Sequence, residues 1–343
     1  MSYEYERVAT PASGLRLHLN ENTAGCSPAV IEAIRALTRG QIAEYPDYDT
    51  VVEATAARLN TSADSLLLTN GLDEGILVAA MVALRATGGD AEGIVVVPAF
   101  DMYAACTDAL GGRVIEVPLG AGFEFPVERV LTAVTARTRI VWLTNPNNPT
   151  GQSIPRDAIA RIAAAANHAI VFVDEAYADF GGSTLIGDPL LRQYPKLIVG
   201  RTFAKAYGLA GIRAGAVVGD PDTIASFRRA APPYSLNVCA AAALPPAFRD
   251  RTYYDWYVDQ VAHSRELLYA GLERLGVRYW KSNANFVLAQ FDGRGSAIAS
   301  ALAGRGVHVR DRSNDPGCGD CLRVTAGVAE HTRQFLAALE SVL

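Results

Sequence analysis

Short apolar runs alternate with longer amphipathic segments through the middle of the chain. The runs are rich in β-branched residues and predict strands, and the segments between them, such as 71–87 and 156–168, predict helices. The expected strands are 93–97, 114–118, 139–144, 169–174, 196–200 and 214–219. This alternation predicts an α/β fold, in which a mostly parallel sheet carries helices on both faces. Ligand-binding groups should then gather at the carboxyl ends of the strands.

The two ends of the chain follow a different pattern. A helix is expected to begin at Ser27-Pro28, with Ser27 as its cap, and to close at Gly40. After Pro245-Pro246 the pattern predicts a long helix (253–275), short strands around 285–291 and 322–325, and a final helix reaching residue 343. We therefore expect a large domain over 45–245 and a smaller α+β domain over 246–343, which residues 1–44 join.

Composition excludes several classes of protein. Half of the 343 residues are hydrophobic, and 31 basic against 36 acidic residues give a net charge of -5, which argues against disorder and against nucleic acid as a partner. The first 14 residues are polar and no run of 18 apolar residues occurs, so we expect no membrane span and a cytoplasmic protein. The cysteines are too scattered for a disulfide framework and fit a reducing compartment: Cys26, Cys106, Cys239, Cys318 and Cys321.

Only three lysines occur, so chemistry that needs an amine has three candidates. Lys205 follows the predicted strand 196–200 and stands between Ala204 and Ala206, which places its amine at the carboxyl edge of the sheet. An amine among apolar groups is more readily deprotonated and becomes a nucleophile towards an aldehyde. Lys196 and Lys281 have polar or strand-start positions and look solvated. A partly buried surface lysine is the alternative interpretation of Lys205.

Asp174 ends the apolar run 169–174, and Tyr177 follows three residues later. A carboxylate at the end of a buried strand costs free energy unless it meets a cation or several hydrogen-bond donors. A helix cap would explain such a residue. A fixed anion would also keep a pyridine nitrogen protonated, and a nearby phenol could bind a ring oxygen.

Two loops add candidate binding groups. Residues 143–151 (LTNPNNPTG) hold three asparagines and two prolines, more than a plain tight turn requires. Gly71, in LTNGLDEG, stands at the start of a predicted helix, where backbone N–H groups can bind a phosphate. Many helices begin this way, and Thr202 and Arg213 strengthen the interpretation.

Together these motifs resemble those of the class I/II aminotransferases, which are fold-type I pyridoxal-phosphate (PLP) enzymes, and especially the histidinol-phosphate aminotransferases among them. The resemblance covers nearly the whole chain. Its motifs are LHLNENTAGCSP (17–28), YPDYD (45–49), TNGLDEG (69–75), PAFDMY (98–103), NPNNPTG (145–151), DEAY (174–177), RTFAKAYGLAGIR (201–213), PPYSLN (232–237), VRDRS (309–313) and CLRVTAG (321–327).

The resemblance assigns roles to these residues. It implies that Lys205 forms the Schiff base with PLP and carries the proton between substrate and cofactor, with Asp174 on the pyridine nitrogen. Asn148 and Tyr177 would bind the phenolic oxygen. The remaining cofactor contacts that it implies are Gly71, Leu72, Asp73, Thr202 and Arg213 at the phosphate, Phe100 on the ring, and Tyr45 reaching the cofactor of the second subunit of a homodimer.

For substrate, the resemblance places Arg323 at an anionic group of the amino donor, with Arg310 and Asn22 nearby. A planar guanidinium binds such a group in bidentate fashion. We hypothesise that Arg310 with Arg323 favours a phosphate over a carboxylate. The donor stays open between histidinol phosphate, an aromatic amino acid and a specialised pathway intermediate. The acceptor would be a 2-oxo acid such as 2-oxoglutarate.

Other functions stay open at this stage. A decarboxylase or an oxidase can use the same fold, because the reaction depends on which bond lies perpendicular to the ring. A non-catalytic cofactor-binding protein would be expected to lack the lysine. Ala204, Thr23 and Phe100 depart from the family pattern and put the substrate in doubt. Cys318 and Cys321 form one CxxC pair, which predicts a flexible loop and no metal site.

Overall fold

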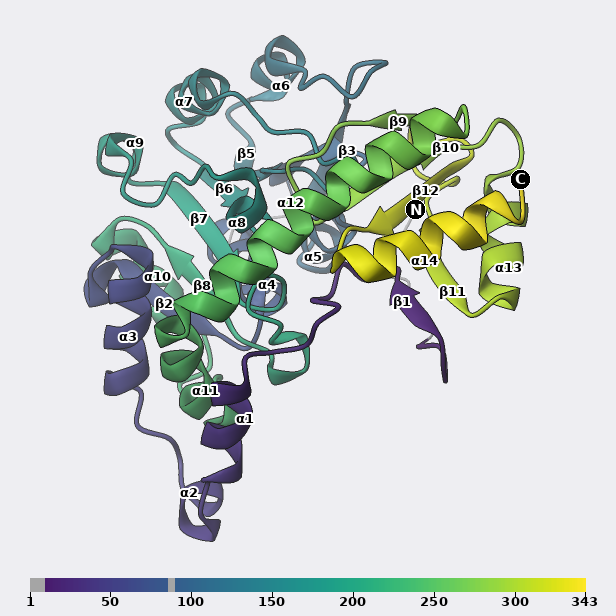
Figure 1. The fold of residues 1–343 in the computed structure, drawn as a ribbon. Helices are drawn as coiled ribbons and strands as arrows, with labels where there is room; N and C mark the ends of the chain where they lie inside the picture. The colour runs from purple at the N-terminus through teal and green to yellow at the C-terminus, as the bar shows by residue number, and fades with distance from the viewer. Residues whose placement is uncertain (1–9, 86–89) are drawn as a thin grey trace.

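The structure, a computed structural model, describes residues 10–85 and 90–343, and two sheets organise it (Figure 1). The larger sheet has the strand order β2-β8-β7-β6-β5-β3-β4. The strands are β2 (Leu66–Thr69), β3 (Glu92–Val97), β4 (Arg113–Pro118), β5 (Thr138–Thr144), β6 (Ile170–Asp174), β7 (Leu197–Thr202) and β8 (Gly215–Val218). Strands β3 to β7 pair in parallel, whereas β8 is antiparallel to β7 and β2. The predicted mostly parallel sheet is confirmed.

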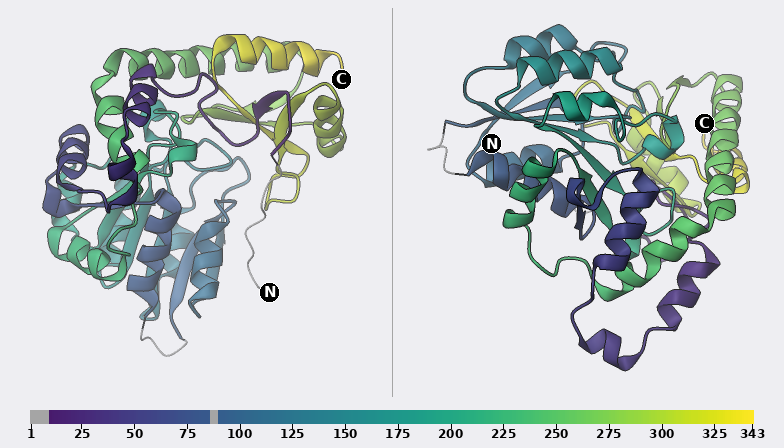
Figure 2. Two further views of the ribbon diagram at one scale, coloured as in Figure 1. Left: turned by 90° about the horizontal axis from the view of Figure 1, so that it is seen from below. Right: turned by 90° about the vertical axis from the view of Figure 1, so that its left-hand side faces the viewer.

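Both faces of this sheet are covered by helices, which explains its continuous apolar runs (Figure 2). In β5, Ile140 and Trp142 join one core cluster while Val141 and Leu143 join the other. The first cluster includes side chains of α4 (Leu72–Leu84), α5 (Met102–Ala109) and α10 (Pro221–Ala230). The second includes α3 (Asp49–Leu59), α6 (Val127–Ala133), α7 (Arg156–Ala165), α8 (Ala178–Gly181), α9 (Pro189–Gln193) and α11 (Val238–Arg249).

The smaller sheet joins the two ends of the chain. Its order is β1-β11-β12-β10-β9, and β1 (Leu15–Leu17) pairs in parallel with β11 (Val307–Asp311). The other strands are β9 (Arg278–Trp280), β10 (Phe286–Gln290) and β12 (Cys321–Thr325). Helices α12 (Arg251–Arg274) and α14 (Ala329–Glu340) lie side by side, with α13 (Gly295–Gly304) packed against β11 (Figures 1 and 2). The amino-terminal strand therefore brings residues 18–22 between the two sheets.

The expected first helix is shorter than its pattern predicts. Helix α1 (Pro28–Arg35) is capped by Ser27 as expected but ends before Gly40. A second helix, α2 (Arg39–Ala43), begins because the Thr38 side chain accepts a hydrogen bond from the Gln41 backbone and the Gln41 side chain accepts one in return. Gly40 lies inside α2, so the prediction that it closes the first helix is wrong.

The structure also bears on the expected domain boundary at residue 245 and on the expected helix over residues 71–87. Pro245 and Pro246 lie inside α11, so a domain boundary between 245 and 246 would cut that helix. The domain division stays a prediction. The helix expected over 71–87 is α4, and residues 86 and 87 lie outside the described part of the chain, as do residues 1–9 of the polar amino-terminal stretch. Within residues 10–85 and 90–343, no helix is both long and apolar enough to cross a membrane.

Candidate active site

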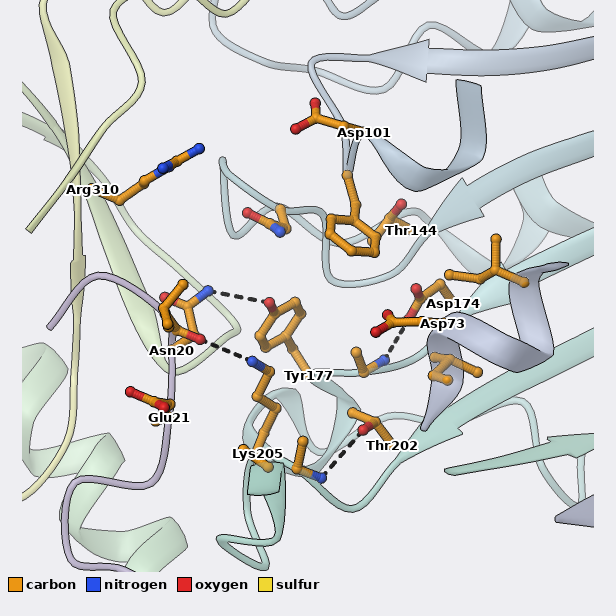
Figure 3. A pocket seen from close by; sticks show the side chains of 18 of the residues that line it. Asn20, Glu21, Asp73, Asp101, Thr144, Asp174, Tyr177, Thr202, Lys205 and Arg310 are labelled. Carbon is orange, nitrogen blue, oxygen red and sulfur yellow. Dashed lines mark hydrogen bonds between the residues drawn. The ribbon is translucent and has the colours of Figure 1, made fainter. Parts of the chain in front are cut away.

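A cavity of about 270 Å³ lies at the carboxyl edge of the large sheet (Figure 3). Three of its lining residues, Thr144, Asp174 and Thr202, are the last residues of adjacent parallel strands. The structure also brings most of the predicted site residues to this cavity. Those that line it are Leu72, Asp73, Phe100, Asn148, Asp174, Tyr177, Thr202, Lys205, Arg213, Arg310 and Arg323.

Asp174 lies buried at the bottom of the cavity. Its Oδ2 accepts a hydrogen bond of 2.6 Å from the Tyr103 hydroxyl, and its Oδ1 accepts one of 2.8 Å from the Ala176 backbone N–H. Thr144 in turn donates to the Tyr103 hydroxyl. Burial is the main cause that raises the pKa of Asp174 to about 6, although both hydrogen bonds favour the carboxylate. No described residue forms an ion pair with this carboxylate, and a protonated pyridine nitrogen would supply such a partner.

Sequence reasoning missed Tyr103 as the partner of Asp174. The two residues are 71 positions apart, and Tyr103 lies in the first turn of α5. Its spacing of three from Phe100 puts both on the same side of that turn, and their rings meet edge to face with centroids 5.9 Å apart. This spacing was the available signal.

Lys205 stands on the other side of the cavity from Asp174, with Tyr177 between them (Figure 3). Its Nζ donates to the Leu19 carbonyl oxygen at 2.9 Å, and lies 5.8 Å from the centre of the Tyr177 ring. The Tyr177 hydroxyl accepts a hydrogen bond of 3.1 Å from Asn20 Nδ2. The amino-terminal segment 19–21 therefore closes the cavity over the lysine and the phenol.

Asn20 occupies the position at the cavity that was expected for Asn22. The Asn22 side chain points elsewhere, because its Oδ1 accepts from the Ala24 N–H and its Nδ2 donates to the Ala206 carbonyl oxygen. Asn22 lines a neighbouring cavity instead. Tyr45 also lies outside the cavity of its own chain, where its ring is 77% exposed and stacks on Tyr234 with centroids 4.1 Å apart.

An anion-binding corner forms where α4 begins. Gly71 caps this helix at φ 78°, and a Cβ at this position would lie 2.4 Å from Arg213 Nη2. Glycine is therefore required both by the backbone angle and by the arginine. Arg213 donates to Asp73 at 2.7 Å, and Thr202 lines the same cavity. Helix N–H groups, a guanidinium and a hydroxyl suit a phosphate.

Paired arginines enter the cavity from the small sheet. Arg310 on β11 stands opposite Arg323 on β12 in the strand register. Arg323 is buried and donates to Asn148 Oδ1 at 2.5 Å and to the His18 carbonyl oxygen at 2.6 Å, while its Nε has no hydrogen-bond partner among the described residues. Burial lowers the pKa of Arg323 to about 10. An anionic ligand would offset the cost of burying this charge.

Besides Arg213, Arg310 and Arg323, a fourth arginine lines the cavity, and sequence reasoning did not single it out. Arg312 lies two residues beyond Arg310 and forms an ion pair with Asp315. The same segment holds Cys318 and Cys321, which are both buried against Phe123 and not in an exposed loop, because successive turns fold them inward. Within residues 10–85 and 90–343, no group of three or more histidine, cysteine or acidic residues is placed to hold a metal ion.

Comparison with known proteins identifies the family. Residues 12–339 match the family model described as aminotransferase class I and II. The chain belongs to this family. The family resemblance seen in the motifs is thereby confirmed, and Lys205 is the lysine that this aminotransferase carries at the cavity.

Three proteins similar to this aminotransferase are histidinol-phosphate aminotransferases. This aminotransferase is 32% identical to a histidinol-phosphate aminotransferase of Geobacillus over 96% of this chain and 90% of that protein, and 35% identical to one of Symbiobacterium thermophilum with the same coverage. The solved histidinol-phosphate aminotransferase of Sinorhizobium meliloti, in complex with pyridoxal-5'-phosphate, is 26% identical with a TM-score of 0.84 and covers 96% of this chain and 92% of that one.

The cavity of this aminotransferase has the chemistry that such a cofactor requires. Asp174 is a buried carboxylate that forms no ion pair with any described residue, Gly71 opens the anion-binding corner beside Arg213, and Lys205 presents an amine between them. Phe100 and Ala176 line the space where a flat ring would lie. These residues fit PLP.

Proposed function

We propose that this chain is a homodimeric PLP-dependent aminotransferase that moves an amino group from a phosphorylated amino alcohol of the histidinol-phosphate type to 2-oxoglutarate. The observation that carries the proposal is the opposed pair Arg310 and Arg323, which enters the same cavity as Lys205. The names of the relatives support the donor. The five cysteines are all free, as in a reducing compartment, so we place the enzyme in the cytoplasm.

In this proposal each cofactor contact comes from a residue of the cavity. PLP, when bound, supplies an aldehyde that captures amino groups and a ring that accepts an electron pair. Asp174 keeps the proton on the pyridine nitrogen, and its raised pKa is lowered again by that cation. Tyr177 and Asn148 bind the phenolic oxygen, and Asn148 Nδ2 is the donor because its Oδ1 already accepts from Arg323.

Lys205 moves the proton of the reaction. Its Nζ lies in the cavity beside Tyr177, where the α-carbon of a donor held by Arg323 would stand. The neutral amine would take the α-proton of the donor and hold it for return, while PLP would supply the electron sink. The Arg310 and Arg323 guanidinium groups orient the donor so that the α-proton faces this amine, and segment 19–21 limits water access.

Histidinol phosphate and histidinol make a matched pair of donors that differ only in the phosphate. In a single-turnover assay without acceptor, we expect the phosphate ester to convert the bound cofactor to its amine form far faster. Arg310→Ala should reduce this preference by about 10- to 100-fold, because a charge-assisted contact contributes about 1.5–3 kcal/mol. Equal loss for both donors would sink the phosphate assignment. Oxygen consumption or release of carbon dioxide would show another reaction.

The homodimer is supported by exposed aromatic and apolar side chains on one projecting part of the chain. Tyr45 stacks on Tyr234 at the surface, and Ile42 in α2 is 63% exposed. Helix α2 projects from the body of the molecule (Figure 1). A surface of this kind is typical of a protein interface.

Mixing two inactive variants tests whether subunits share sites. If Tyr45 serves the partner's cofactor, a hybrid of Lys205→Ala and Tyr45→Ala subunits holds one intact site. Random exchange should then restore roughly a quarter of the wild-type activity, since half of the dimers are hybrids with one of two sites intact. Light scattering should report a dimer throughout. No recovery after exchange would place Tyr45 outside the neighbouring site.

A further inference from the structure

Glu21 lies where two cavities meet. The active-site cavity and a second one of about 570 Å³ share Glu21, Ala204 and Ala210 in their linings. Figure 3 shows Glu21 and Arg310 well apart from each other, on the side of Tyr177 and Lys205 that faces away from Asp174. A donor held by its phosphate at Arg310 therefore has room for a second arm that extends towards Glu21.

Only one of the two carboxylate oxygens of Glu21 has a hydrogen-bond partner among the described residues. Its Oε1 accepts a hydrogen bond of 2.7 Å from Arg16 Nη2, and its Oε2 has no hydrogen-bond partner among the described residues. The ion pair is partly buried, with 29% of the Glu21 side chain and 38% of the Arg16 side chain exposed. Because Arg16 compensates the carboxylate charge, the pair presents a strong acceptor with little net charge.

The backbone around Glu21 is held on both sides. The Asn20 N–H donates to Thr325 Oγ1 at 3.1 Å, and Asn22 Nδ2 donates to the Ala206 carbonyl oxygen at 3.1 Å. Glu21 is therefore fixed before the substrate arrives, and little conformational entropy is lost when Oε2 accepts a hydrogen bond.

We propose that Glu21 selects the second arm of the amino donor by accepting a hydrogen bond from a neutral N–H group of a heteroaromatic ring. The inference rests on the proposed function and deepens it. A cationic arm would meet Arg16 and Lys205, an anionic arm would meet the Glu21 carboxylate, and an apolar arm would bury Oε2 without a hydrogen-bond partner. A neutral imidazole N–H satisfies Oε2 and leaves the Arg16 ion pair intact.

Two donors with the same phosphate and amine test this role on the holoenzyme. Histidinol phosphate carries an imidazole, and phenylalaninol phosphate carries a ring of similar size without an N–H. Saturation of the single-turnover rate gives the dissociation constant and the limiting rate separately, and calorimetry gives the dissociation constant independently. The variants are Glu21→Ala, which removes the acceptor, and Glu21→Gln, which keeps a side-chain oxygen.

We expect Glu21→Ala to weaken binding of histidinol phosphate by about 10- to 100-fold, as for loss of a hydrogen bond to a charged group. Binding of phenylalaninol phosphate and both limiting rates should change little. Glu21→Gln should weaken histidinol phosphate less than Glu21→Ala does.

Three results would overturn the assignment. Equal weakening of both donors would mean that Glu21 only supports segment 19–21, and no weakening of either would remove it from recognition. In both cases the proposed function still holds, provided that the wild-type enzyme converts histidinol phosphate. A wild-type enzyme that converts and binds neither phosphate donor would overturn the proposed function and this assignment together.

Discussion

Replacing Lys205 by alanine will abolish multiple turnover while leaving the protein folded. In the proposed mechanism, the variant loses both the amine that would link the cofactor covalently and the group that would move the α-proton. Loss of general base catalysis alone costs about 100- to 10,000-fold in rate, and we expect at least that. Reduction with borohydride followed by mass spectrometry should find the cofactor on Lys205 in the wild type and nowhere in the variant.

Lys196→Ala is the matched control for this experiment. The Lys196 amine is exposed, donates to the His168 carbonyl oxygen and does not line the cavity. Its variant should keep the wild-type rate and the modified Lys205 peptide. Addition of a small primary amine should restore part of the activity of Lys205→Ala, since the cavity retains its other groups. Undiminished multiple turnover by Lys205→Ala would refute the mechanism.

Asp174→Asn should stabilise the cofactor-free protein and damage the loaded enzyme. The pKa of Asp174 is raised by burial from 3.8 to about 6, so the folded cofactor-free protein binds a proton more tightly than the unfolded chain. This group therefore favours folding below pH 3.8, and that contribution is lost as the pH rises through 6. At pH 8 the penalty is about 3 kcal/mol, which neutral asparagine avoids in large part.

Urea unfolding of the cofactor-free proteins at pH 5 and pH 8 checks the sign. Asp174→Asn should be more stable than the wild type at pH 8, with a smaller difference at pH 5. Asp188→Asn is the opposite case, because its hydrogen bond from Arg156 lowers the pKa of Asp188, so removing the charge should destabilise the protein at pH 8. If Asp174→Asn were less stable than the wild type at pH 8, the buried carboxylate would be stabilising the fold.

The loaded enzyme should respond to Asp174→Asn in the other direction. In the proposed mechanism, the pyridinium would lose its buried counterion without the carboxylate, and breaking such a pair costs about 3–5 kcal/mol. Cofactor affinity measured by equilibrium dialysis and the single-turnover rate should both fall steeply. Unchanged cofactor affinity would show that Asp174 does not contact the ring nitrogen.

Local chemistry in the sequence was enough to predict much of the site. Strands such as β5 read as continuous apolar runs because both of their faces are buried, which indicates a parallel sheet. Because parallel strands end at the same edge, Thr144, Asp174 and Thr202 lie there together. The scarcity of lysine isolated Lys205 as the amine. Gly71 was recognisable because it stands between an apolar run and the start of a predicted helix. These features depend on neighbours close in the chain or on the period of a strand.

Contacts between distant segments were decided only by the tertiary structure. Tyr103 reaches Asp174 across 71 positions, and β1 carries Glu21 from the start of the chain to a sheet built near its end. Asn20 lines the cavity in place of Asn22 because the Asn22 side chain is occupied by Ala24 and Ala206. A side chain's direction depends on which partners satisfy its polar atoms, and for these residues the decisive partners lie far away in sequence.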